Sequence, residues 1–274
     1  MNTIPKYDVS IDVYNRTSDI SIKDSRSYYI YSSVPDKLRD TWAWDKKIFI
    51  KGDKTAPHVF IDGVNIEMSP SSKGPAIELN KKASAYIYFI GKNSSLQGAD
   101  GRAAIQKNRS EGQLYVLART GTTVTCKGGD KAAGIGGSYA TRNISNGYYN
   151  GDMYGHGVNM HFGSRSNPDY WGGTIVADGG NGGAGIGGGS YGTDGAEVEP
   201  DTSGLTTNGS IAYYAPGADM ENDKPTSITF GTSSQPEKPT DPGAERGMDA
   251  PLYRVTDKDG KDIAPVSYTH LRAH

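Results

Sequence analysis

The side chains best suited to chemistry in this chain gather between positions 139 and 171. This segment holds His156, His161, Asp152 and Asp169, and zinc can be held by histidine and carboxylate ligands. The spacing of these four residues matches no standard zinc motif, so no metal site is predicted. Acidic residues elsewhere form no recurrent pair that would place two carboxylates in one cleft, as glycoside hydrolysis requires. No catalytic residue is therefore assigned.

Aromatic residues are the more informative feature of this segment, because 7 of them fall within its 33 positions. Tyr and Trp present flat apolar faces and a polar edge, which suits them to contact sugar rings. Alternatively, the segment folds over the rest of the molecule and buries its own rings. On the first interpretation, the ligand-binding residues are Tyr148, Tyr149, Tyr154, Tyr170 and Trp171.

Glycine-rich stretches at 128–137 and 179–189 could in principle hold phosphate or calcium. Residues 180–185 read G-x-G-x-x-G, but more glycines follow instead of the helix whose N-terminus would hold a pyrophosphate. A calcium-binding β-roll needs an Asp in its G-G-x-G-x-D turn, and Ala133 and Ala184 stand at that position. No cofactor is therefore predicted, and the turn motifs do not support calcium binding.

The composition favours strands as the elements that position these residues. The 274 residues include 37 Gly and 18 Tyr but only 8 Leu and 8 Glu, and helical proteins rely on Leu, Glu and Ala. Short alternating apolar runs, such as that around Ile87, lie between clusters of Gly, Asn, Asp and Ser and predict half-buried strands. The sequence therefore predicts an all-β fold, with one or two helical turns at most around 35–44.

Charge, hydropathy and cysteine content exclude several classes of protein. The net charge of −2 gives no electrostatic case for nucleic acid. No apolar run reaches the roughly 18 residues of a membrane span, and no signal peptide is visible near Met1. Cys126 is the only cysteine, so no intramolecular disulfide is possible, and it is predicted to be a small buried residue.

An internal repeat organises the middle of the chain. Four segments place a glycine turn and small residues before an isoleucine, and these isoleucines lie 28, 30 and 51 residues apart. The last gap returns to 30 if about 21 residues of 139–171 are an insertion. Such a repeat fits a parallel β-helix, of one coil or a coil and a half per unit, with the isoleucines stacked inside. The predicted core ladder is Ile77, Ile105, Ile135 and Ile186, and the predicted corner glycines are Gly128, Gly129, Gly134, Gly136, Gly179, Gly180, Gly185 and Gly187.

These repeats resemble a known family. The stretches GGDKAAGIGGS (128–138), DGGNGGAGIGGGS (178–190) and VFIDGVNIEMSPSSKGPAIELN (59–80) are similar to repeats of bacterial cell-surface carbohydrate-binding-domain proteins. The resemblance covers about 47–190 and implies a right-handed parallel β-helix that is secreted or attached to the cell wall and binds or displays glycans. It offers no catalytic residue that maps onto this chain.

The ends of the chain divide from the repeats. VSYTHLRAH (266–274) resembles translated sequencing-adapter sequence of the kind fused to reading frames in metagenomic assemblies, so this tail is interpreted as non-native. The other predicted parts are N-terminal strands and a cap (1–46), the β-helix repeats with the 139–171 insertion loop (47–232), a Pro-rich linker (233–248) and an incomplete β segment (249–265).

Three functions compete for this sequence. The first is a monomeric, non-catalytic protein, extracellular or at the cell surface, that binds or displays polysaccharide or host glycan. The second is a polysaccharide lyase or glycoside hydrolase on the same scaffold. The third is a structural fibre or adhesin. The aromatic insertion without an accompanying carboxylate pair favours the first function.

Overall fold

The computed structural model describes residues 4–69, 74–80, 82–107, 112–139, 144–145, 148–149, 160–162, 170–180, 185–187, 189, 198–200, 204–208 and 229–230. Within these ranges the chain is all-β, and its only helical element is the short 3-10 helix η1 (Asp36–Leu38). This confirms the predicted fold class at the level of all-β. No described helix is long and apolar enough to cross a bilayer.

The strands are short, with one exception in the middle of the chain. β11 runs over 14 residues and turns through a register shift between Ala118 and Thr123. The strands are β1 (Val9–Asp12), β2 (Ile20–Ile22), β3 (Ser27–Tyr31), β4 (Ile48–Lys51), β5 (His58–Asp62), β6 (Asn65–Glu67), β7 (Ile77–Asn80), β8 (Ala85–Phe89), β9 (Ser94–Gln97), β10 (Ile105–Gln106), β11 (Leu114–Lys127), β12 (Ile135–Gly136), β13 (Ile144–Ser145), β14 (Tyr148–Tyr149), β15 (Met160–Phe162), β16 (Gly172–Asp178), β17 (Ile186–Gly187), β18 (Val198–Pro200), β19 (Gly204–Asn208) and β20 (Thr229–Phe230).

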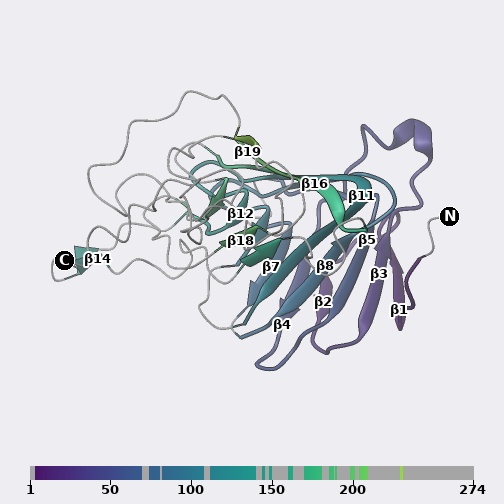
Figure 1. Cartoon of the computed structure of the whole chain (residues 1–274), viewed down its shortest axis with the longest axis horizontal. Coiled ribbons are helices and arrows are strands. Elements are labelled where there is room, and N and C mark those ends of the chain that lie inside the picture. Colours follow the sequence, from purple (N-terminus) through teal and green to yellow (C-terminus); the bar gives the residue numbers. More distant parts are fainter. Residues whose placement is uncertain are drawn as a thin grey trace, which may run out of the picture.

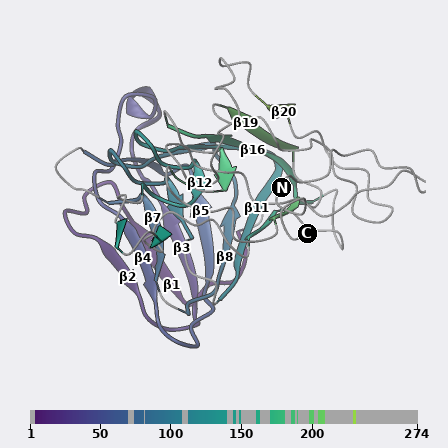
Figure 2. The same ribbon diagram turned by 90° about the vertical axis from the view of Figure 1, so that its left-hand side faces the viewer.

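These strands form two sheets of parallel strands. The larger has 12 strands, with β1-β3-β5-β8-β11-β16-β19-β20 as its main path, and the smaller has the order β17-β12-β10-β7-β4-β2. Figure 1 shows β1, β3, β5, β8 and β11 side by side, and Figures 1 and 2 together show that the larger sheet is curled. A separate pair, β13 and β14, is antiparallel. Up to β12, the chain passes repeatedly between the two parallel sheets.

The register of both sheets follows the sequence repeat. In the smaller sheet Ile77 pairs with Ile105, Ile105 with Ile135, and Ile135 with Ile186, so the four predicted ladder residues lie on adjacent strands. The same ladder begins two strands earlier, at Ile20 and Ile48. Each repeat of 28 to 30 residues therefore advances the chain by one strand in this sheet, and the longer step precedes Ile186.

Alternation along each strand separates a dry interior from an outer face. In β8, Ala85, Ile87 and Phe89 are buried, whereas Tyr86 and Tyr88 between them are partly exposed. The inward residues of both sheets join one hydrophobic core cluster. Cys126 lies in that cluster and is fully buried, as predicted, and burial raises the pKa of its thiol above the ordinary value.

The glycine turns allow neighbouring repeats to approach closely. A Cβ on Gly129 would meet the backbone carbonyl of Ala99, and a Cβ on Gly180 would meet the carbonyl of Gly129. Only a residue without a side chain fits such a stack of corners. The predicted corner glycines lie just after β11 (Gly128, Gly129), around or in β12 (Gly134, Gly136), after β16 (Gly179, Gly180), and around or in β17 (Gly185, Gly187).

The N-terminal residues belong to the same two sheets. β1 and β3 extend the larger sheet and β2 ends the smaller one. Trp44 bridges to Ile66 and donates its indole N–H to the carbonyl of Arg16 at 2.8 Å, so it lies inside the core. Trp42 is partly buried against that core and contacts Tyr14 edge-on.

The predicted insertion contains part of the larger sheet. Met160, His161 and Phe162 form β15, which pairs in parallel with the first half of β11. The segment 139–171 therefore returns to the scaffold before the chain enters β16. The predicted linker at 233–248, the incomplete segment at 249–265 and the tail at 266–274 lie outside the described residues.

Candidate aromatic binding site

Two of the five predicted ligand-binding residues lie on the outer face of the larger sheet. Tyr170 and Trp171 come directly before β16, opposite the turn of β11. The backbone N–H of Thr120 donates to the carbonyl of Tyr170 at 2.9 Å, which ties this segment to β11. Tyr148 and Tyr149 form β14, but their side chains are outside the described part, as is all of Tyr154.

Tyr88, Arg119, Tyr170 and Trp171 form a cluster that we call the outer aromatic patch. The Trp171 ring lies 5.0 Å from the Tyr88 ring, tilted by 40°. Tyr170 meets Trp171 edge-on at 4.7 Å, and the Arg119 guanidinium carbon lies 5.0 Å from the centre of the Tyr170 ring. Tyr170 exposes 37% of its surface, and Trp171 and Tyr88 are partly exposed. These rings are therefore accessible while being held by their neighbours.

The scaffold beneath the patch fixes Tyr88. Its ring packs on Phe60 at 4.8 Å, and its hydroxyl lies 3.0 Å from Nδ1 of His58. Burial raises the pKa of Tyr88 to about 12 and lowers the pKa of His58 below its ordinary value. The Tyr88 hydroxyl therefore stays protonated at neutral pH, and the phenol remains a neutral group able to form hydrogen bonds.

A second aromatic feature, the stacked aromatic row, crosses four neighbouring strands beside the patch. It consists of His58, Tyr86, Tyr115 and His161, which are register partners on β5, β8, β11 and β15. Successive ring centres are 4.7, 4.5 and 4.5 Å apart, and the planes differ by only 5°, 7° and 14°. These rings cover one another's faces, so the row presents ring edges outward and mainly ties the strands together.

This row is not evident from the sequence alone. His58, Tyr86 and Tyr115 are spaced by 28 and 29 residues, which is the period of the isoleucine ladder. That spacing was an available signal, but it becomes meaningful only when the strand register is known. His161, which was considered as a metal ligand, instead stacks on Tyr115 and lies 2.7 Å from the side-chain oxygen of Gln113. No cluster of three metal-ligating side chains occurs among the described residues.

The geometry of the patch supports binding by contact with flat, partly apolar surfaces. Trp171 and Tyr170 are inclined to each other by 87°, so they form a corner instead of a closed stack. Arg119 supplies a positive charge behind Tyr170 and is itself largely buried. A search of protein-family models, of curated proteins and of solved structures finds no match to this chain.

Proposed function

We propose that this chain is a non-catalytic protein, extracellular or at the cell surface, that binds polysaccharide through the outer aromatic patch. The observation that carries the proposal is the corner formed by Trp171 and Tyr170 over Tyr88, on the outside of a regular scaffold. Amphipathic rings of this kind can cover the apolar face of a sugar while polar groups at the edge form hydrogen bonds.

The proposed scaffold is a right-handed parallel β-helix. Support comes from two sheets of parallel strands visited in turn, from the isoleucine ladder, and from the glycine corners that stack on one another. In such a fold, equivalent outward residues of successive coils line up at the strand spacing of about 4.8 Å. A long polymer can then contact several coils at once, and this extended surface suits a polysaccharide better than a small molecule.

The experiment is affinity electrophoresis of the full chain through gels that contain one soluble polysaccharide each. We expect at least one neutral or acidic polysaccharide to retard the chain, and Trp171→Ala to abolish that retardation. Removal of one aromatic platform typically costs enough free energy for about a tenfold loss of affinity or more.

Leu38→Ala is the control. Leu38 also exposes a large apolar side chain (39%), but it lies in η1 and outside the aromatic cluster that contains Tyr88 and Trp171. We expect this variant to be retarded like the unchanged chain. A chain that passes every gel unretarded, or a Trp171→Ala variant retarded as strongly as the control, contradicts the proposal.

A further inference from the structure

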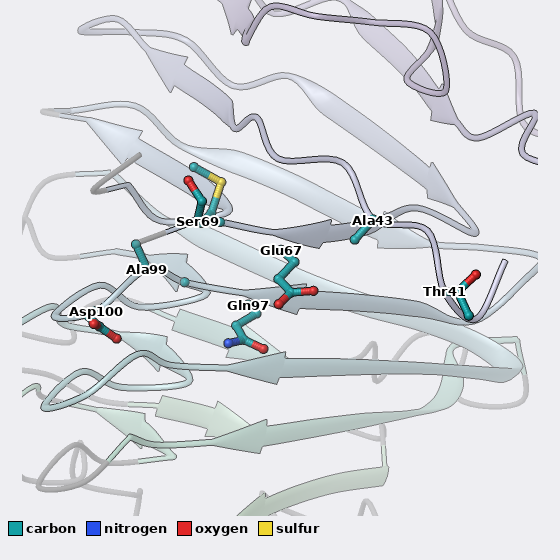
Figure 3. A pocket seen from close by; sticks show the side chains of 9 residues that line it. Thr41, Ala43, Glu67, Ser69, Gln97, Ala99 and Asp100 are labelled. Carbon is teal, nitrogen blue, oxygen red and sulfur yellow. The ribbon is translucent and has the colours of Figure 1, made fainter. Parts of the chain in front are cut away.

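A groove of about 450 Å³ lies at the ends of β6 and β9 in the larger sheet, and it shares no residue with the outer aromatic patch. Its lining includes Glu67 at the end of β6, Gln97 at the end of β9, and Asp100 in the turn that follows β9. Thr41 comes from the segment after η1. Figure 3 shows Glu67 and Gln97 beside each other, with Asp100 and Thr41 on opposite sides of them. The volume falls within the range of small-molecule sites.

Glu67 and Gln97 are direct register partners on adjacent parallel strands. Their side chains therefore leave the sheet about 4.8 Å apart and in the same direction. A carboxylate accepts two or more hydrogen bonds, and an amide both donates and accepts. Adjacent hydroxyl groups of a sugar ring lie closer together than the two strands, and the flexible Glu and Gln side chains can converge on them, so this pair can hold two neighbouring hydroxyls.

Three polar side chains of the groove, those of Glu67, Gln97 and Asp100, are available to a ligand. Among the described residues, no hydrogen bond or ion pair engages the side chains of Glu67, Gln97 or Asp100. Ala43 is the partly exposed apolar residue of the same lining, because Met68 and Ala99 are buried in the core. The groove thus combines acceptors, one amide donor and an apolar contact surface.

Charge limits which sugar can bind. Among the described residues, two carboxylates and no basic side chain line the groove, and Lys127 is the register partner of Gln97 on the next strand, outside the lining. A ligand that carries its own carboxylate would be repelled by Glu67 and Asp100. Charge-assisted hydrogen bonds from neutral hydroxyls to these carboxylates are favourable.

We infer that this groove is a second binding site, which takes one uncharged sugar residue with adjacent hydroxyl groups. The inference rests on the proposed function only for its ligand class, because the groove shares no residue with the outer aromatic patch. It assigns to Glu67 and Gln97 the direct contacts with the sugar hydroxyls, and to Asp100 the discrimination against acidic sugars.

Amide chemical shifts of the isotopically labelled full chain test the inference, with methyl glucopyranoside and its glucuronic acid counterpart as probes. We expect the neutral sugar to shift the amide signals of Gln97, Ala99 and Asp100, with a dissociation constant in the millimolar range. The acidic sugar should bind at least about tenfold more weakly. Glu67→Ala and Gln97→Ala should each weaken binding of the neutral sugar by about tenfold.

Glu78→Gln is the matched control, because Glu78 is a carboxylate of the smaller sheet that pairs with Lys47 at 2.6 Å. It should bind the neutral sugar like the unchanged chain. The inference is overturned if the Glu67→Ala variant binds the neutral sugar as tightly as the unchanged chain, or if the unchanged chain binds the two sugars with equal affinity. Trp171→Ala should leave the sugar-induced amide shifts unchanged. The amide shifts therefore test the groove alone, and electrophoresis tests the outer aromatic patch alone.

Discussion

Lys107 shows how single residues depart from the repeat. It is 1% exposed and follows the ladder residue Ile105 by two positions. The equivalent positions of the preceding repeats are apolar and are occupied by Ile22, Ile50 and Leu79. Its backbone N–H donates to the carbonyl of Gly136 at 2.9 Å, as expected for the smaller sheet. Burial lowers the pKa of its ammonium group to about 8. The side chain is therefore accommodated at a cost in stability near neutral pH.

The lowered pKa of Lys107 predicts a dependence of stability on pH. Between about pH 8 and the ordinary lysine pKa of about 10.4, the unfolded chain binds a proton at this site that the folded chain has lost. Lys107 should therefore contribute a rise of about 3 kcal/mol in the free energy of unfolding across this window, while tyrosines such as Tyr88, whose pKa is raised, contribute in the opposite direction. Urea unfolding of the unchanged chain and of Lys107→Leu at pH 7.5 and pH 10.5 isolates the lysine contribution, because the variant should gain less stability, or lose more, over this interval. An identical change in Lys107→Leu would show that other groups cause it.

Tyr88 shows what can be predicted of a binding residue from sequence. Its outward direction followed from the alternation with Ile87 and Phe89. Its partners did not, because Phe60 and His58 lie 28 and 30 residues earlier and Trp171 lies far later in the chain. Tyr170 and Trp171 were singled out only by the local density of aromatic residues. Which of those aromatics share a surface depends on strand register, and a single sequence does not contain it.

The elements of this molecule are held by ladders that cross the strands. The isoleucine ladder could be predicted from Ile77 onward because small residues precede each isoleucine at a nearly constant spacing. Its first members, Ile20 and Ile48, lack the glycine turn and the small residues before the isoleucine, so pattern matching missed them. β15 was hidden for another reason, since it lies within a segment that lengthens one repeat.

A substitution in the middle of the isoleucine ladder should be costly. Ile105 is fully buried between Ile77 and Ile135, and Ile105→Ala would remove packing on both sides. We expect the free energy of unfolding to fall by about 2–5 kcal/mol. Urea denaturation followed by circular dichroism gives the value. Ile4→Ala is the control, since Ile4 is 50% exposed, and it should change stability by less than about 0.5 kcal/mol.

The corner glycines provide a separate test of how the repeats stack. In Gly129→Ala the added methyl group would press on the backbone carbonyl of Ala99, which cannot move without shifting the preceding repeat. We expect a loss of stability greater than about 2 kcal/mol.

Gly121→Ala is the comparison for that corner. Gly121 has a φ of +84° but open space around it, so alanine there adds backbone strain alone. Its cost should be about 1–2 kcal/mol. Thermal unfolding of both variants ranks them, and a Gly129→Ala variant as stable as the unchanged chain would argue against the close approach of the corners.

At the scale of the whole molecule, inner and outer residues have different tasks. The inner residues form one hydrophobic core, and the isoleucine ladder within it is continuous from β2 to β17, which gives a regular scaffold. The outer face of the larger sheet carries two aromatic features. In the stacked aromatic row, each ring face is covered by a neighbouring ring. In the outer aromatic patch, the rings of Tyr170 and Trp171 meet at an angle. Only the second arrangement leaves rings positioned to receive a ligand, so the proposed function depends on Tyr170 and Trp171.

The fluorescence of Trp171 during a polysaccharide titration tests this account most directly. The chain has 3 tryptophans, of which Trp44 is buried in the core and Trp42 packs against it at the N-terminal end. With a polysaccharide that retards the chain in electrophoresis, we predict a saturable change in tryptophan emission that is absent from Trp171→Phe. An emission change that persists in Trp171→Phe, or retardation of the chain without any change in emission, would contradict binding at the outer aromatic patch.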